Sequence, residues 1–232
     1  MKSADEILAE IKKILATKWQ TREGLVVPEA ENIRLGNDAV KLNGTVLYAD
    51  MADSTGLVNG FKDWFAAEVY KAYLVAACRV IRNNGGIITA FDGDRVMAVY
   101  IGKAKDSSAA KTALQLNWVV IQINAAIKAA YTTTAFVLKH SVGIDTSSLF
   151  VARTGIRNAN DLVWVGRAAN YAAKLSGFSE LGYSLFITEP VFNAMSDASK
   201  NGGIPKQCMW IKGYWEDRNL TIYKSNWHWK PI

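Results

Sequence analysis

Two aspartates that follow apolar segments are the residues best suited to chemistry. Asp50 comes directly after the β-branched and apolar segment Thr45–Ala49, and Asp94 lies 44 positions later (94 − 50) in an Asp-Gly-Asp turn. Carboxylate oxygens are the ligands that Mg²⁺ and Mn²⁺ prefer, and Mg²⁺ commonly takes one or two carboxylates together with substrate phosphates. Two ions held in this way can activate an attacking hydroxyl and neutralise a leaving phosphate. The spacing alone leaves a second interpretation open, in which Asp50 ends a strand and Asp94 stabilises a turn.

The segment that follows Asp50 is small and hydroxylic, and reads Met51-Ala52-Asp53-Ser54-Thr55. It joins the predicted strand to a predicted helix, and backbone N–H groups at a helix start can bind an anion such as a triphosphate. Serine and threonine also cap helices without any ligand. This segment therefore favours phosphate chemistry only in combination with the two aspartates.

The elements that must position these residues alternate along the chain. Strands are predicted at Thr45–Ala49, Ile87–Phe91, Arg95–Ile101, Phe136–Ile144, Leu149–Arg153, Ser184–Ile187, Met209–Ile211 and Leu220–Tyr223. Helices are predicted at about Leu57–Arg82, Ser107–Tyr131 and Asn170–Phe178. The order from Thr45 is β-α-β-β-α-β with additions, the ferredoxin-like arrangement of the α/β (α+β) class. In that arrangement the first strand and the hairpin are neighbours, so Asp50 and Asp94 can converge.

The N-terminal segment predicts a further helix. Ser3-Ala4-Asp5-Glu6 fits a capping box, and an apolar stripe of helical spacing follows it at Ile7, Leu8, Ile11, Ile14 and Leu15. We expect this stripe to pack on its own domain, with a dimer contact as the alternative. Residues 22–44 are poorly periodic. We therefore predict an N-terminal helix and lead-in segment at residues 1–44 and the main domain at residues 45–232, in a single domain overall.

Composition narrows the class of protein. Half of the 232 residues are hydrophobic and 21% are charged, which is typical of a globular chain. The Lys and Arg residues behind the net charge of +6 are scattered, so a nucleic-acid partner is not favoured. No apolar run approaches the roughly 20 residues that span a bilayer, and the N-terminus lacks a signal-peptide pattern. Because the chain has only Cys78 and Cys208, we expect no disulfide. We also expect no membrane partner and a cytoplasmic location.

Four segments resemble, in order, the motifs of class III adenylate and guanylate cyclases. Leu47–Thr55 resembles the first metal-binding segment, and Asp92–Tyr100 resembles the second, built around Gly-Asp and Met-Ala-Val. Gly143–Thr146 is similar to the strand turn after the second long helix, and Gly166–Lys174 to the segment that supplies the transition-state pair. The resemblance predicts a class III nucleotidyl cyclase catalytic domain, with short additional strands, and the activity of a phosphorus–oxygen lyase.

The resemblance also implies a set of site residues. It implies two divalent metal ions, Mn²⁺ or Mg²⁺, at Asp50, Met51 and Asp94. It implies a homodimer in which two chains pack head to tail and share two active sites. In that dimer Asn170 orients the ribose, and Lys174 one turn later stabilises charge on the phosphate of the nucleotide bound to the other chain. The family usually has arginine where this chain has Lys174, and a lysine cannot form the bidentate fork.

Triphosphate contacts are implied at two places. One is the Ala52-Asp53-Ser54-Thr55 turn, and the other is Lys212, because Lys212-Gly213 is similar to the late Lys-Gly element of these domains. For Asn170 and Lys174 an exposed helix face without a role is the alternative when their motif is taken alone.

The base pocket departs from the family pattern. Purine cyclases read the base with two polar side chains, whose positions are here Ala90 (94 − 4) and Val163 (170 − 7). Neither can hydrogen-bond a base, and an unpaired buried polar group loses on the order of 1–3 kcal/mol. Tyr48 points to the same face of its strand as Asp50 and can occupy the volume of a purine, while Arg95 can donate to a pyrimidine carbonyl. The alternative places Tyr48 in the core and Arg95 in solvent.

A closer resemblance fits these departures. The compact chain, its lead-in segment Leu35–Val40, and Tyr48-Ala49-Asp50 before Ser54-Thr55 are similar to the pyrimidine cyclases of bacterial Pycsar anti-phage systems. That family makes cyclic UMP or cyclic CMP, which acts on a separate effector protein, and we favour UTP over CTP. Three other functions remain as alternatives: a divergent adenylate cyclase, a catalytically dead cyclase-like binding module and, behind both, a nucleic-acid binder.

Overall fold

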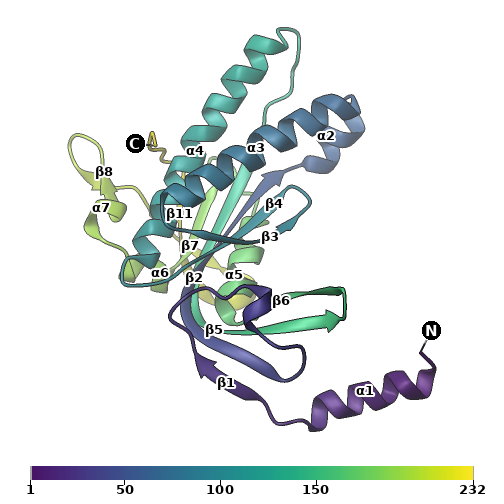
Figure 1. Cartoon of the computed structure of the whole chain (residues 1–232). Coiled ribbons are helices and arrows are strands. Elements are labelled where there is room, and N and C mark those ends of the chain that lie inside the picture. Colours follow the sequence, from purple (N-terminus) through teal and green to yellow (C-terminus); the bar gives the residue numbers. More distant parts are fainter. Residues whose placement is uncertain (1, 232) are drawn as a thin grey trace. The chain divides into compact units, whose positions relative to one another are not determined.

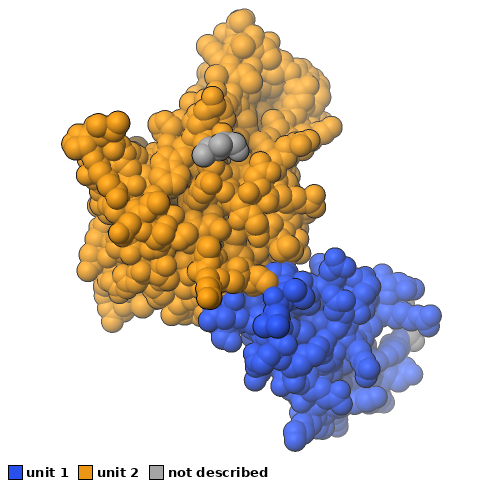
Figure 2. Space-filling model, turned by 60° about the vertical axis from the view of Figure 1, so that its left-hand side comes forward, with its two compact units in different colours: residues 1–43, 148–166 blue, residues 44–147, 167–232 orange. Residues whose placement is uncertain are grey.

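The computed structural model describes residues 2–231, which divide into two compact units (Figure 1, Figure 2). Unit 1 comprises the chain up to Asn43 together with residues 148–166, and unit 2 comprises residues 44–147 and 167–232. Two long strands, β2 (Asp38–Ala52) and β5 (Lys139–Ile156), contribute residues to both units. This division differs from the predicted boundary after residue 44, and the single-domain organisation stays a prediction.

Unit 2 is built on a twisted sheet with the strand order β10-β11-β7-β5-β2-β4-β3. Besides β2 and β5 its strands are β3 (Ile87–Asp92), β4 (Arg95–Tyr100), β7 (Leu185–Thr188), β10 (Ile211–Trp215) and β11 (Leu220–Ser225). β2 pairs antiparallel with β4, which pairs antiparallel with β3, whereas β5 and β7 are parallel. The first strand therefore lies beside the hairpin, and the predicted ferredoxin-like α/β fold is confirmed.

Two long helices, α3 (Asp63–Asn83) and α4 (Lys105–Ala130), pack on each other and on the sheet (Figure 1). The prediction of one helix from Leu57 to Arg82 is wrong in extent, because the chain leaves the helical conformation between α2 (Ser54–Gly60) and α3. α4 begins at Lys105, two residues before the predicted start at Ser107, which lies inside its first turn. The remaining elements of unit 2 are α5 (Arg167–Ser176), α6 (Glu189–Ala194), α7 (Asp197–Lys200), β8 (Asn201–Gly202), β9 (Gln207–Cys208) and the short 3-10 helix η2 (Glu216–Arg218).

The two faces of this sheet pack against different helices. On β7 the side chains of Leu185 and Ile187 belong to the large core under α3 and α4. Phe186, between them, belongs to a second cluster with Leu175 of α5 and Trp215 of β10. Successive side chains of a strand point to opposite faces, so α5 covers the face opposite to α3 and α4.

The same alternation orients the end of β2. Leu47, Ala49 and Met51 are buried in the core under α3 and α4. Tyr48 and Asp50 therefore point to the α5 face of the sheet. The sequence pattern of β2, in which polar side chains interrupt an apolar run near its end, thus places two partly buried polar side chains on this face.

Unit 1 contains α1 (Ala4–Ala16), β1 (Gln20–Glu23), the 3-10 helix η1 (Ala30–Asn32) and β6 (Ala159–Val165). β1 pairs with the beginning of β2, and β6 forms a hairpin with the end of β5. The predicted capping box at Ser3 is present. No residue of α1 is buried, and its five large apolar side chains are 47–82% exposed. The expected packing of this stripe on its own domain is therefore wrong for the residues that the structure describes.

Three other expectations can be compared with the structure. The lead-in segment contains ordered elements, since β2 already begins at Asp38, and the two strands predicted at Phe136–Ile144 and Leu149–Arg153 are one strand, β5. Cys78 and Cys208 are free thiols, as expected. Between residues 2 and 231 no helix combines the length and the apolar character that crossing a membrane requires.

Candidate active site

The structure brings Asp50 and Asp94 together at one end of the central strands. Asp50 lies on β2 one residue beyond Ala49, which pairs with Val96 of β4. Asp94 lies in the two-residue turn between β3 and β4, where Gly93 has a φ of +62°. Glycine adopts this conformation without strain, and two-residue hairpin loops with glycine in first place depend on it. The turn chemistry thus fixes where the second carboxylate lies.

The carboxyl group of Asp50 is in an unfavourable environment for its charge. Burial raises its pKa to about 6, the guanidinium of Arg95 opposes this shift, and the neighbouring charge of Asp94 adds to it. The Arg95 Nε atom lies 3.7 Å from Asp50 Oδ2, which is too long for a hydrogen bond. Asp94 Oδ2 is buried and has no hydrogen-bond partner among the described residues. Both carboxylates therefore retain binding capacity that the protein itself does not use.

This donor set fits a divalent cation that also binds phosphate. No group of three or more His, Cys, Asp or Glu side chains able to hold a metal occurs within residues 2–231. Mg²⁺ usually binds through one or two carboxylates plus substrate oxygens, which matches a pair with an unpaired buried oxygen. The side chain of Met51 is in the core on the opposite face, so Met51 can contribute only main-chain atoms.

The base-pocket candidates Tyr48 and Ala90 lie in one row that crosses β2, β4 and β3. Tyr48 of β2 is opposite Met97 of β4, which is opposite Ala90 of β3. The guanidinium carbon of Arg95 lies 5.8 Å from the centroid of the Tyr48 ring, and burial raises the pKa of the Tyr48 hydroxyl. The sequence interpretation missed Met97, although the alternation from Arg95 along β4 could have identified it. Tyr48 and Arg95 form one contacting surface beside Asp50.

Val163 belongs to a different unit from the residues of that row. It lies on β6 opposite Ala152, in unit 1, and its side chain is 38% exposed. The other base-pocket candidates belong to unit 2. A role for Val163 at the base stays a prediction.

Asn170 and Lys174 lie one turn apart on the exposed side of α5. Neither side chain forms a hydrogen bond or ion pair with any described residue, whereas Ala172 and Leu175 on the other side are buried. α5 lies close to β5, since a Cβ atom on Gly143 would come within 2.1 Å of the Ala172 carbonyl oxygen. Only glycine permits that approach.

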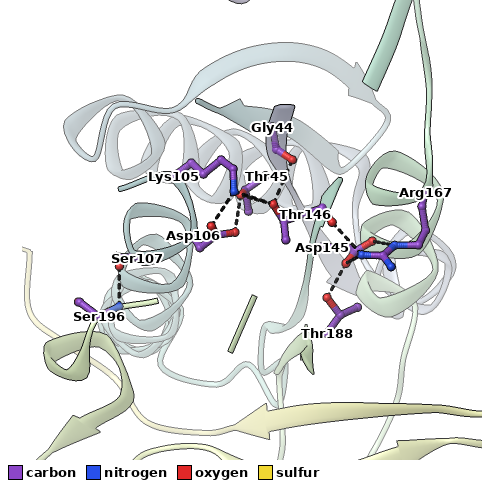
Figure 3. A network of polar contacts seen from close by, with 10 residues as sticks. All are labelled: Gly44, Thr45, Lys105, Asp106, Ser107, Asp145, Thr146, Arg167, Thr188 and Ser196. Atoms are coloured by element: carbon purple, nitrogen blue, oxygen red, sulfur yellow. Dashed lines mark hydrogen bonds and ion pairs between the residues drawn. The ribbon is translucent and has the colours of Figure 1, made fainter. Parts of the chain in front are cut away.

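The first turn of α5 is held by an ion pair to which the sequence analysis gave no role. Arg167 Nε and Nη2 donate to the two carboxylate oxygens of Asp145 on β5, at 3.0 and 3.2 Å, and Nη2 also donates to the Thr146 carbonyl at 2.8 Å (Figure 3). The Thr188 hydroxyl donates to the same carboxylate, whose side chain is fully buried. A pair separated by 22 residues (167 − 145) gives no local sequence signal.

A second buried carboxylate is paired just as completely. Asp106 accepts hydrogen bonds from the Thr45 hydroxyl at 2.6 Å and from Lys105 Nζ at 2.7 Å (Figure 3). Lys105 also donates to Thr146 Oγ1 at 2.9 Å. This network joins the first turn of α4 to β2 and β5, and its β2 residue Thr45 precedes Asp50 on the same strand.

The predicted triphosphate residues lie on two elements. Asp53 has a φ of +58° and caps α2 by accepting a hydrogen bond from the Gly56 N–H at 3.2 Å, and Ser54 and Thr55 follow in the first turn. Lys212 lies on β10, opposite Tyr223, with an exposed side chain that has no described partner. β10 and β3 stand at opposite ends of the strand order.

Within residues 2–231, no hydrogen bond or ion pair joins the two aspartates to Asn170, Lys174 or Lys212. Tyr48 and Asp50 point to the same face of the sheet as α5, but α5 packs on β5 and β7 whereas the aspartates come from β2 and the β3–β4 turn. A single chain thus presents two separate sets of polar side chains on one face.

The fold is that of class III cyclases. The chain superimposes on an adenylyl cyclase from P. aeruginosa with a TM-score of 0.68, covering 81% of this chain and 95% of that one at 19% identity. A bacterial light-regulated adenylyl cyclase gives the same TM-score, at 22% identity, with 80% and 91% of the two chains covered.

Sequence relatives narrow the class further. A protein of Xanthomonas perforans named Uridylate cyclase is 48% identical over 229 residues, covering 97% of each chain. Proteins of the same name from Burkholderia cepacia and Rhodovulum sp. (strain MB263) are 44% and 36% identical, again over 97% or more of both chains. The chain matches no protein-family model. It belongs to the uridylate cyclase family and is a nucleotidyl cyclase, a lyase.

Proposed function

We propose that this cyclase closes a pyrimidine nucleoside triphosphate, UTP in preference to CTP, into its 3′,5′-cyclic monophosphate. The 3′ oxygen of the ribose forms a bond to the α-phosphorus, the bond from that phosphorus to the bridging oxygen breaks, and pyrophosphate leaves. The hydroxyl proton passes to solvent.

The observation that carries the proposal is the surface formed by Tyr48 and Arg95 beside Asp50. The Tyr48 ring, under the Arg95 guanidinium, occupies space next to the carboxylates, and Ala90 and Met97 in the same row offer no group that could read a purine edge. A small base leaves the phenol and guanidinium free to meet its carbonyl groups, while a purine overlaps with the ring. The names of the three nearly full-length relatives also support uridine as the base.

Asp50 and Asp94 are proposed to hold two divalent ions, Mn²⁺ or Mg²⁺. Bound ions would lower the pKa of the attacking hydroxyl and offset charge on the leaving phosphate. The contribution of the chain itself is to place one unpaired buried carboxylate oxygen and one partly buried carboxylate side by side. Arg95 limits their mutual repulsion from a distance of 3.7 Å without occupying the oxygens through a hydrogen bond.

A head-to-tail homodimer is proposed to complete the site. Asn170 and Lys174 have no side-chain partner among residues 2–231, and they face outward from the same side of the sheet as the aspartates. A two-fold pair that apposes these faces would bring α5 of one chain over β2 of the other, twice. Asn170 would orient the ribose, and Lys174 would stabilise charge on the phosphate, with Lys212 and the Ala52–Thr55 turn at the triphosphate.

The biological role is proposed from the same resemblance. The cyclic nucleotide would serve as a second messenger in anti-phage defence, acting in the cytoplasm on a separate effector protein. Neither a membrane nor a nucleic acid is needed by this scheme.

The test of substrate is a competition among bases. The purified enzyme is given equal amounts of ATP, GTP, CTP and UTP with Mn²⁺, and products are identified by mass spectrometry, with Asp94→Asn as the inactive control. The proposal predicts cyclic UMP as the main product and cyclic CMP as the next. Cyclic AMP or cyclic GMP formed at the rate of cyclic UMP would contradict a pyrimidine substrate, and no product from any base would contradict the proposed reaction.

The test of the shared site is complementation. Asp50→Asn and Lys174→Ala proteins, each inactive alone, are mixed under conditions where subunit exchange is verified with labelled chains. Each heterodimer would contain one wild-type site and one doubly altered site, so activity should return to about a quarter of the wild-type level at equal mixing, half of the dimers being mixed and each holding one intact site. Verified exchange without recovery would place all catalytic side chains in one chain.

A further inference from the structure

A cavity on the other side of unit 2 shares no residue with the proposed active site. It has a volume of about 660 Å³ and is bounded by the first turns of α4, by the α6–α7 connection and by the C-terminal segment around Trp229. Pockets that bind small molecules usually measure about 300–1,000 Å³. The cavity is therefore large enough for a ligand the size of a nucleotide.

The walls of this cavity are tied together by hydrogen bonds. The Ser196 backbone N–H donates to Ser107 Oγ at 2.8 Å, which joins the α6–α7 connection to α4 (Figure 3). The C-terminal segment is held along α4 at two points, since the Trp229 N–H donates to the Leu114 carbonyl at 3.0 Å and Asn117 Nδ2 donates to the Trp227 carbonyl at 2.9 Å. The cavity is thus a built feature of three fixed segments.

The C-terminal segment directs its side chains to alternate sides. Trp227 and Trp229 are half-buried and pack on the core, whereas His228 and Lys230 are exposed. Because the Trp side chains anchor the segment, His228 and Lys230 are held at the cavity rim in an extended chain. The tryptophan-rich C-terminus thereby fixes the position of one cation.

The charge of the lining has one sign. Lys111 and Lys230 contribute positive charge, His228 contributes an imidazole ring, and no Asp or Glu side chain lies in the lining. None of these three side chains forms an ion pair or hydrogen bond with any residue in the described part of the chain. Lys111 is half-buried on α4 and has no counter-ion among the described residues. Its ammonium group can therefore pair with an anion that enters the cavity.

Neutral donors complete the lining. Ser107 accepts the Ser196 N–H and can still donate its own hydroxyl proton, Ser108 has no side-chain partner among the described residues, and the Gln115 amide is buried at the base. Hydroxyl and amide donors that share one cavity with two ammonium groups match an anion with several oxygens. A single carboxylate would use only part of this lining.

We propose that this cavity is a second anion-binding site, which takes the oligophosphate group of a small molecule. The two sources of such a group are inorganic oligophosphate and the phosphate chain of a nucleotide. Lys111 of α4 and Lys230 of the C-terminal segment bind the phosphate oxygens, and the serine hydroxyls of α4 contribute further hydrogen bonds. The site is independent of the proposed reaction at Asp50 and Asp94.

The experiment measures binding of inorganic triphosphate by calorimetry to the full chain carrying Asp94→Asn, in EDTA and at fixed ionic strength. EDTA and Asp94→Asn weaken the metal-dependent binding expected at the active site. In this background Lys111→Ala and Lys230→Ala should each lower the affinity about tenfold, which corresponds to about 1.4 kcal/mol, because each removes a charge-assisted hydrogen bond to phosphate. Lys128→Ala, a matched exposed lysine near the other end of α4, should leave it unchanged.

Further arms identify the source and the specificity. UTP and ATP are titrated under the same conditions. Tighter binding of the nucleotides than of inorganic triphosphate, lost in Lys111→Ala, would assign the site to nucleotides, and equal binding would assign it to the phosphate chain alone. Absence of binding at millimolar triphosphate, or an equal loss in Lys128→Ala and Lys111→Ala, would overturn the proposal. Loss of binding in Lys174→Ala with none in Lys111→Ala would also overturn it, by placing the anion at the active site. Thermal melting verifies that each variant is folded, and cyclase turnover of Lys111→Ala in the otherwise wild-type chain should be retained.

Discussion

Asp50 and Asp94 differ from Asp106 and Asp145 in how the rest of the chain treats their charge. Asp145 is fully buried, yet it has two guanidinium donors and a hydroxyl, and Asp106 has an ammonium and a hydroxyl. Asp50 is less buried but has only a backbone hydrogen bond from Met51 and a guanidinium 3.7 Å away, and Asp94 has a buried oxygen without a partner among the described residues. Asp106 and Asp145 have a complete set of partners within the chain, so their function is to hold elements together. Asp50 and Asp94 have an incomplete set of partners, which a folded chain tolerates where a ligand supplies the missing interaction.

The largest expected effect follows from replacing Asp50 or Asp94, whose carboxylates have an incomplete set of partners within the chain. Asp94→Asn or Asp50→Asn should lower kcat at least about 1,000-fold, because each removes a charged ligand that acts only with substrate bound. The unfolding free energy should stay the same or rise by up to about 1 kcal/mol, since two neighbouring carboxylates no longer repel each other. Cyclase assays and urea denaturation measure the two effects.

The double variant sharpens this expectation. Because residues that act as a unit are non-additive, Asp50→Asn combined with Asp94→Asn should cost little more activity than either change alone. An Asp94→Asn protein with near-normal turnover would break the comparison, because the incomplete carboxylate would then have no chemical role.

The opposite pattern, a loss of stability, is expected for Asp145, whose carboxylate has its partners within the chain. Asp145→Asn should lower the unfolding free energy by about 2–3 kcal/mol, because Arg167 and Thr188 lose their charged acceptor while the site stays buried. Asp217→Asn, at an exposed aspartate without side-chain partners, is the matched control and should change stability by less than about 0.5 kcal/mol. Equal stability of the two variants in urea would show that the ion pair does not hold α5.

A smaller effect is expected at the base. Tyr48→Ala should raise turnover of ATP and GTP relative to UTP about tenfold, because deletion of the ring removes the overlap that excludes a purine. The Mn²⁺ concentration for half-maximal activity should change less than this ratio. Competition assays with mixed nucleotides measure the selectivity, and an unchanged ratio would return Tyr48 to a packing role.

The last expected effect concerns His140, a buried polar group that also has its partners within the chain. His140 is held neutral between Tyr73 and Asn117, and burial lowers its pKa to about 4 from an ordinary value of 6.5. As the pH falls below about 6.5 the unfolded chain binds this proton first, so stability is lost between about pH 6.5 and pH 4, by at most about 1.4 kcal/mol per pH unit.

The second histidine supplies the control for that prediction. Denaturation of wild type and His140→Gln is compared at several pH values. The pH dependence of the unfolding free energy should be smaller in the variant by the contribution of about one proton. His228→Gln, at the exposed histidine, should keep the slope of the wild type. Parallel curves for wild type and His140→Gln would contradict the assignment.

The sequence was sufficient for features that depend on local chemistry. The Asp-Gly-Asp turn predicted the hairpin, and the alternation of apolar residues predicted that Asp50 and Tyr48 share a face of β2. The sequence was insufficient where a feature depends on a contact between residues that are far apart in the chain. The Asp145–Arg167 pair and the row through Met97 depend on strand order and register.

Packing of α1 shows the limit of periodicity. Its apolar stripe predicted a helix correctly, but the stripe carries no information about what covers it, and no described residue of α1 is buried. The break between α2 and α3 was missed for a related reason, because Phe61 and Lys62 are compatible with a continuing helix until the surrounding packing is known.

Direct binding of Mn²⁺ tests whether Asp50 and Asp94 form the metal site. Free Mn²⁺ is followed by electron paramagnetic resonance while wild type, Asp50→Asn, Asp94→Asn and Asp145→Asn are titrated at a temperature at which circular dichroism shows all four to be folded. Wild type and Asp145→Asn should show the same saturable binding, and each of the other two variants should lose it. Saturable binding that survives in Asp94→Asn, or that disappears in folded Asp145→Asn alone, would contradict the account.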